Sequence, residues 1–182
     1  MDMEDYSVEL DPETELYCTL YLFVDVTNII EIYEKIINGK LSCCITKASL
    51  IVDALQAVVA TNKAALNAKR NRLTTKSVYT EILFCLSMTK NISRSLSAFG
   101  ISDNDKNIVV ILIHKLDEKQ TMSADVLCSI KGERISISRI QEFTDVNLVK
   151  KTYKINEDEL CISDLTGAVV SRISCKDFML IK

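Results

Sequence analysis

The sequence has very little proline or glycine, with one proline and four glycines in 182 residues. Such residues usually mark linkers, so their scarcity argues against two domains joined by a Pro- or Gly-rich linker, and the length fits one domain with a buried core. The glycines also lie far apart, at positions 39, 100, 132 and 167. Phosphate-binding loops need closely spaced glycines, so no P-loop, Rossmann fingerprint or kinase glycine loop is present.

Long apolar runs are absent as well. No stretch approaches the ~18 residues of a membrane-spanning helix, so we expect no membrane partner. The first residues, Met1 to Asp5, are acidic, whereas a secretory signal begins with a basic segment followed by an apolar run. We therefore expect the protein in the cytoplasm and nucleus.

Metal-ligand patterns are also missing. Seven cysteines occur without any CxxC spacing, and His114 is the single histidine available for a mixed zinc site. An odd number of cysteines without a secretory signal indicates reduced thiols, most of them small core residues. We expect no metal and no cofactor.

The pattern of apolar residues predicts an α/β fold. Residues 16–24 and 108–113 are short, nearly continuous apolar runs, which favour buried strands. Helical spacing predicts helices over residues 28–39, 47–72, 91–100 and 162–173, and it favours a helix over 78–86. We expect residues 1–15 to be an acidic, loosely held tail and residues 16–182 to form a single helix-rich domain, with a small mixed sheet packed against several helices.

Positive charge is local, because the chain as a whole carries a net charge of −3, which is not typical of a nucleic-acid-binding protein. A run of cations, called here the basic arc, comprises Lys63, Lys69, Arg70, Arg72 and Lys76. It fits a solvated helix end, or a surface that follows RNA phosphates, which Arg94 could join. Lys150, Lys151 and Lys154 form a second, weaker cluster with the same two interpretations.

Two ionisable residues lie within apolar segments. Glu81 could be an acid with a perturbed pKa, and His114, at the end of a predicted strand, could be a general base. The alternatives are a structural carboxylate, which caps a helix or pairs with a lysine, and a strand-end histidine satisfied by water. A small enzyme built on either residue therefore remains a rival hypothesis.

Three segments resemble a known family in their order and spacing. They read IVDxxQxxVAxNKA at 51–64, TEILFxLS at 80–87 followed by NIS at 91–93 and FGIS at 99–102, and VKKxYK at 149–154. Together they resemble the PRPK-binding, CGI-type subunit family of the EKC/KEOPS complex. The chain departs from the family at Ala54, where relatives often carry proline, and at residues 88–90, where Pro-Asn-Asn is common.

The resemblance implies a non-enzymatic α/β protein. Its direct partner would be a PRPK-type atypical kinase, which sits on a threonylcarbamoyl transferase, and the assembly would install threonylcarbamoyladenosine in tRNA, whose CCA end relatives hold. We expect the apolar face of the C-terminal helix to dock the kinase through Leu165, Val169 and Ile173, although this stripe could equally be core. The basic arc and Arg94 would hold tRNA, and an adaptor without RNA contact is the alternative function.

Overall fold

The computed structural model describes residues 5–179, and these residues form an α/β fold as predicted. The strands are β1 (Tyr6–Glu9), β2 (Tyr17–Val24), β3 (Cys44–Lys47), β4 (Ile108–His114) and β5 (Glu133–Ile135). The sheet has the order β1-β2-β4-β3, and β5 also pairs with β2. All pairings are antiparallel, so the prediction of a mixed sheet is wrong. β2 and β3 do run in the same direction, but β4 lies between them and opposes both.

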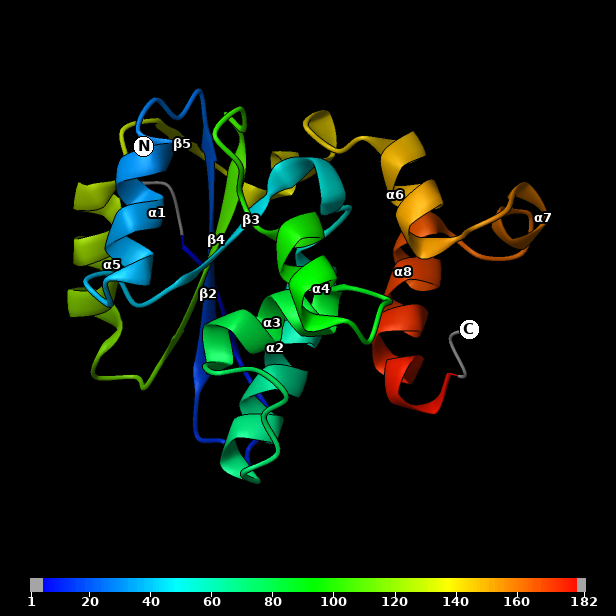
Figure 1. Cartoon of the computed structure of the whole chain (residues 1–182), viewed down its shortest axis with the longest axis horizontal. Coiled ribbons are helices and arrows are strands. Elements are labelled where there is room, and N and C mark those ends of the chain that lie inside the picture. The colour runs from blue at the N-terminus through cyan, green and yellow to red at the C-terminus, as the bar shows by residue number, and fades with distance from the viewer. Residues whose placement is uncertain (1–4, 180–182) are drawn as a thin grey trace.

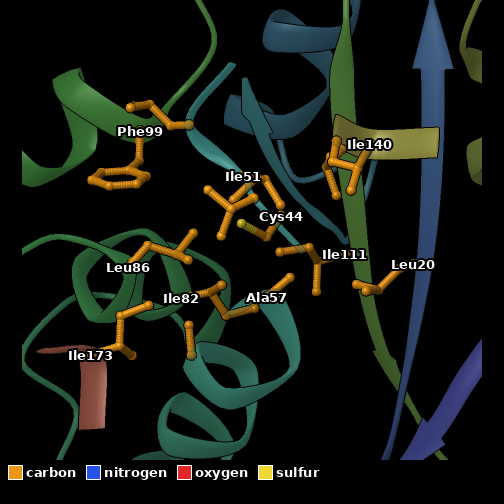
Figure 2. Packing of buried hydrophobic residues seen from close by; sticks show 14 of the residues in the cluster. Leu20, Cys44, Ile51, Ala57, Ile82, Leu86, Phe99, Ile111, Ile140 and Ile173 are labelled. Atoms are coloured by element: carbon orange, nitrogen blue, oxygen red, sulfur yellow. The ribbon is translucent and has the colours of Figure 1, made fainter. Parts of the chain in front are cut away.

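The two central strands form the middle of two cores. All seven residues of β4 are buried, as are all of β2 except Tyr17, which agrees with the two apolar runs of the sequence. Because side chains alternate along a strand, Val109 and Ile111 join one core while Val110 and Leu112 join the other. Figure 2 shows the first of these cores, where Leu20 and Ile111 of the sheet meet side chains from the covering helices.

Helices cover both faces of the sheet (Figure 1). They are α1 (Ile29–Ile37), α2 (Ala54–Lys69), α3 (Val78–Leu86), α4 (Ile92–Phe99), α5 (Lys119–Ser129), α6 (Val146–Tyr153), α7 (Glu157–Leu160) and α8 (Leu165–Cys175), with 3-10 turns at Ala48–Leu50, Ile137–Glu142 and Lys176–Phe178. Figure 1 shows α1 and α5 on one face and α2, α3 and α4 on the other, with α6 and α8 beyond them. None of these helices is long and apolar enough to cross a membrane, over the residues that the structure describes.

The N-terminal segment differs from the predicted loose tail. Residues 6–9 form β1, which pairs with β2 along the edge of the sheet. Leu10 is buried, and the Asp11 N–H donates to Asn62 Oδ1 of α2 at 2.7 Å. The prediction is therefore wrong for residues 6–15, because backbone pairing and one apolar anchor hold this polar segment. Residues 1–4 lie outside the described part of the chain.

Candidate nucleic-acid and partner surfaces

The structure divides the basic arc. The Lys63 ammonium pairs with Asp177 at 2.8 Å and donates to the Ile173 carbonyl at 3.2 Å, so this cation joins α2 to the end of α8. The Arg70 guanidinium forms a two-point pair with Glu13, with Nε 3.0 Å from Oε1, and this pairing lowers the pKa of the Glu13 carboxyl. Lys69, Arg72 and Lys76 remain exposed. Two of the five cations of the arc are therefore already neutralised by the chain itself.

Glu81 shapes the loop that carries the end of the arc. Its carboxylate is fully buried and accepts hydrogen bonds from Asn67 Nδ2 at 3.2 Å, Thr74 N at 3.0 Å, Thr75 N at 2.8 Å and Thr75 Oγ1 at 2.9 Å. These four donors compensate the burial of the carboxylate and hold the loop of Thr74 and Thr75 against α3. This arrangement supports the structural interpretation of Glu81.

Both ring nitrogens of the buried His114 are occupied. The Lys115 carbonyl lies 2.8 Å from Nδ1 and can only accept, so Nδ1 carries the proton. Nε2 then accepts from the Thr19 hydroxyl, also at 2.8 Å, and the ring stacks on Tyr17. The strand-end histidine is thus satisfied, but by protein groups instead of the water that the sequence analysis expected.

A second group of cations meets in a surface hollow of about 570 Å³, called here the basic groove. Its walls are the loop of residues 87–91, α4 and α6, and its cations are Lys90, Arg94, Lys151 and Lys154. Among the residues that the structure describes, no acidic side chain lines the groove. None of the four cations forms an ion pair with any residue between 5 and 179.

Local sequence explains how these cations reach one place. The Asn91 side chain caps α4 by accepting from Arg94 N at 2.9 Å, so the positive end of the α4 dipole lies at the loop that carries Lys90. Lys151 lies on α6, and Lys154 caps the C-terminus of this helix in the left-handed conformation, with φ 53° and ψ 47°. Both residues line the basic groove. Lys150 instead pairs with Glu157 at 2.8 Å, away from the groove lining.

The groove combines pieces that the sequence left apart. It joins Arg94, predicted as an extension of the basic arc, to two lysines of the weaker cluster. Lys90 was not among the predicted RNA contacts. The sequence feature that could have identified Lys90 is its position directly before Asn91, the residue that caps the short helix α4.

The predicted kinase anchors on α8 are core residues. Val169 and Ile173 are 0% and 1% exposed, and Leu165 is partly buried against the same core. Figure 2 shows Ile173 on the side of Ile82 and Leu86. Val169 and Ile173 cannot contact a partner in this structure, because the apolar stripe of α8 faces α2. The exposed apolar side chains lie at the two ends of the helix, where Ile162 is 90% and Phe178 88% exposed.

An uncharged hollow of about 700 Å³, called here the apolar groove, lies on the other side of α4. Residues of α1, β3, α3 and α4 line it, and no charged side chain is among them. Tyr33 and Ile37, both exposed residues of α1, form part of its lining. The molecule thus presents one basic and one uncharged groove, separated by α4.

The fold therefore presents two grooves on its surface, while the core ionisable residues Glu81 and His114 are held by structural hydrogen bonds. Over the described residues, no cluster of three His, Cys, Asp or Glu side chains could hold a metal ion. Residues 23–177 match the family model described as kinase binding protein CGI-121, and the chain therefore belongs to the CGI-121 family.

Several curated proteins are similar to the chain over most of its length. The EKC/KEOPS complex subunit TPRKB of Danio rerio is 38% identical over 163 residues, which cover 90% of this chain and 93% of the relative. The EKC/KEOPS complex subunit CGI121 of Candida glabrata is 30% identical over 155 residues, or 84% and 85% of the two chains. The cgi121 subunit of Schizosaccharomyces pombe is 26% identical over 175 residues, or 93% and 97%. These relatives and the family description confirm the resemblance seen in the sequence.

Proposed function

We propose that this chain is a non-catalytic subunit of an EKC/KEOPS complex, which binds and regulates a PRPK-type atypical kinase and helps to hold tRNA during threonylcarbamoyladenosine modification. The kinase would connect it to the threonylcarbamoyl transferase, in the cytoplasm and nucleus. Membership of the CGI-121 family and the names of the relatives support the complex and the kinase. One observation carries the RNA part of the proposal: the four cations of the basic groove have no acidic neighbour in its lining.

The chemistry of the basic groove suits a single-stranded RNA end. Lysine and arginine neutralise phosphates, and Thr89 and Asn91 offer polar groups for sugars or base edges. Met88 and Leu148, which also line the groove, provide apolar surface against which an unstacked base can pack. Holding one end of the tRNA would raise its effective concentration at the transferase without any bond being made or broken by this chain.

Salt-dependent tRNA binding tests this proposal. We expect the affinity of the full chain for tRNA to fall steeply with salt, with a slope of about −0.7 per neutralised phosphate of a single strand. Lys151→Glu should weaken binding by about tenfold and make the slope shallower, because it reverses a groove charge that has no ion-pair partner in the described part of the chain. Lys69→Glu is the comparison variant, since it reverses an exposed cation of the basic arc that lies close to the Glu13 carboxylate. We expect it to weaken binding less than Lys151→Glu does, and an equal loss would place RNA on the arc as well. An affinity that does not respond to salt would favour the adaptor without RNA contact.

The exposed side of α8 is the surface that we propose for the kinase. Val169 and Ile173 face the core, so the contact would fall to Ile162, Val170 and Phe178, the exposed or partly exposed apolar residues on and around this helix. A large apolar side chain of this kind can serve as an interface anchor once a pocket of the partner buries it.

A pair of charge insertions tests this surface. Phe178→Asp should weaken binding to the purified kinase by at least about tenfold, because an anchor of this size contributes 2 kcal/mol or more. Tyr33→Asp is the control, because it inserts the same charge at the lining of the apolar groove. Calorimetric titration of both variants decides between the two surfaces: loss of binding in Tyr33→Asp alone would place the kinase on the apolar groove.

A further inference from the structure

Directly beneath the basic groove lies a buried tyrosine that the RNA contacts do not use. Tyr153, the last residue of α6, stands between Lys151 and Lys154 in the sequence, yet it is fully buried. Its hydroxyl donates to the Leu86 carbonyl at 2.6 Å and accepts from Gln56 Nε2 at 2.9 Å. Its ring meets Phe99 edge to face, with the ring centres 6.0 Å apart. One side chain thus contacts three other helices.

These contacts reach the other two walls of the basic groove. Leu86 is the last residue of α3 and directly precedes the groove loop of residues 87–91. Phe99 is the last residue of α4, the helix that carries Arg94. Tyr153 itself belongs to α6, the third wall, and therefore connects the loop and α4 to the helix that carries Lys151 and Lys154.

Gln56 of α2 holds the hydroxyl of Tyr153 in place. Its side-chain oxygen accepts from Val52 N at 2.8 Å, and its amide nitrogen donates to the Leu50 carbonyl at 3.0 Å as well as to Tyr153. A buried amide with all these partners has one orientation, because any rotation would leave a buried polar group unsatisfied. Burial also raises the pKa of the Tyr153 hydroxyl strongly, so it stays a donor to Leu86.

Other polar contacts hold α6 elsewhere. The Lys154 carbonyl accepts from Arg172 Nη2 of α8 at 3.2 Å, and the Asp145 N–H donates to the Ser49 carbonyl at 2.9 Å. These bonds tie the two ends of α6 to α8 and to the 3-10 turn after β3. Within residues 5–179, the Tyr153 hydroxyl makes the hydrogen bond that joins α6 to the end of α3.

We propose that Tyr153 is a positioning residue of the basic groove, which sets the spacing between the Lys90–Arg94 pair and the Lys151–Lys154 pair. The inference rests on the proposed RNA function and deepens it. A single strand can engage all four cations only if both pairs lie within reach of successive phosphates, so the register of α6 against the loop determines how many charges act together.

Tyr153→Phe isolates this role, because it removes one hydroxyl and keeps the ring against Phe99. We expect tRNA affinity to fall by about fivefold, the effect of one net hydrogen bond, and the salt slope to become shallower, because fewer cations reach the same strand. Kinase affinity should not change. All measurements are made on the full chain at a temperature where circular dichroism shows it fully folded.

Val126→Ala is the matched control, since Val126 is a buried residue of α5 in the core on the opposite face of the sheet. It destabilises the fold without touching the groove, so its affinity and salt slope should equal those of the wild type. Two outcomes would overturn the positioning role alone, provided that the wild type binds tRNA in a salt-dependent way. One is a Tyr153→Phe variant with the wild-type affinity and salt slope, and the other is a Val126→Ala variant whose affinity falls as much as that of Tyr153→Phe. A wild-type affinity for tRNA that does not change with salt would overturn the RNA part of the proposed function, and this inference with it.

Discussion

The basic arc and the basic groove have similar numbers of cations but different surroundings. Within the arc, Arg70 is paired with Glu13, which lies 57 residues away in the sequence, and Lys63 is paired with Asp177 near the C-terminus. In the groove, no carboxylate lines the hollow and the four cations have no ion-pair partner among the described residues. The comparison shows that a run of basic residues in the sequence does not measure surface potential, because segments distant in sequence supply the counter-charges.

The two regions also differ in how they are built. The arc follows the end of α2 and a loop whose shape depends on one buried carboxylate, that of Glu81. The groove forms where residues 87–94 of one part of the chain meet residues 148–154 of another. We therefore expect substitutions at the framework of the arc to act on stability, and substitutions in the groove to act on RNA binding.

Removing the carboxylate of the arc loop should have the largest effect. We expect Glu81→Ala to lower the free energy of unfolding by about 3 kcal/mol, because the side chain and backbone donors of Asn67, Thr74 and Thr75 lose a buried charged acceptor. Urea denaturation measures the loss. The salt-dependent affinity for tRNA should stay at the wild-type value under folding conditions, since the groove lies elsewhere.

Glu81→Gln is the conservative control for this prediction. It keeps one acceptor oxygen, so its loss of stability should be clearly smaller than that of Glu81→Ala. A loss of tRNA binding in either variant while it remains folded would contradict the division between a structural arc loop and a binding groove. Loss of activity of the whole assembly in a stable Glu81→Gln variant would revive the hypothesis of a small enzyme.

The strands show where sequence reasoning succeeds. Continuous apolar runs predicted β2 and β4, because a strand buried on both faces admits few polar residues. β1 escaped prediction, since it has only four residues, none of them fully buried, and its main support is backbone pairing with β2. Helix α2 shows a similar limit: Leu55 is 47% exposed, whereas close packing against α3 and α8 fully buries the smaller Ala57, Ala60 and Ala64.

The candidate surfaces were predictable only in part, for a different reason. Helical spacing found the apolar stripe of α8 correctly, but periodicity cannot tell whether a stripe faces the chain's own core or a partner. The structure places Val169 and Ile173 in the core. Arg94, Lys151 and Lys154 were recognised as cations, yet their meeting depends on the contact between α6 and the end of α3 through Tyr153, which no local pattern encodes.

The smallest expected effect concerns the pH dependence of stability at Lys176, a buried lysine next to Lys63 of the arc. The Lys176 ammonium lies over the Phe84 ring, donates to the Phe84 carbonyl, and has Lys63, Asp177, Glu81 and Cys85 around it. Burial lowers its pKa from the ordinary 10.5 to about 8. Above pH 8 the unfolded chain therefore binds more protons at this residue than the folded chain does, so this residue's contribution to stability rises with pH up to the unfolded pKa.

The test compares unfolding free energies at pH 7 and pH 9. The difference between the wild type and Lys176→Met should shift in favour of the wild type by about 1 kcal/mol over this range. Taking the difference cancels the opposing titration of Cys18, Cys43 and Cys44, which are not among the groups around Lys176. Lys154→Met, which removes an exposed cation of the groove, should show no such shift against the wild type. The same pH dependence of the unfolding free energy in Lys176→Met and Lys154→Met would contradict this prediction. It would mean that burial does not distinguish the cation inside the fold from the exposed cation of the groove.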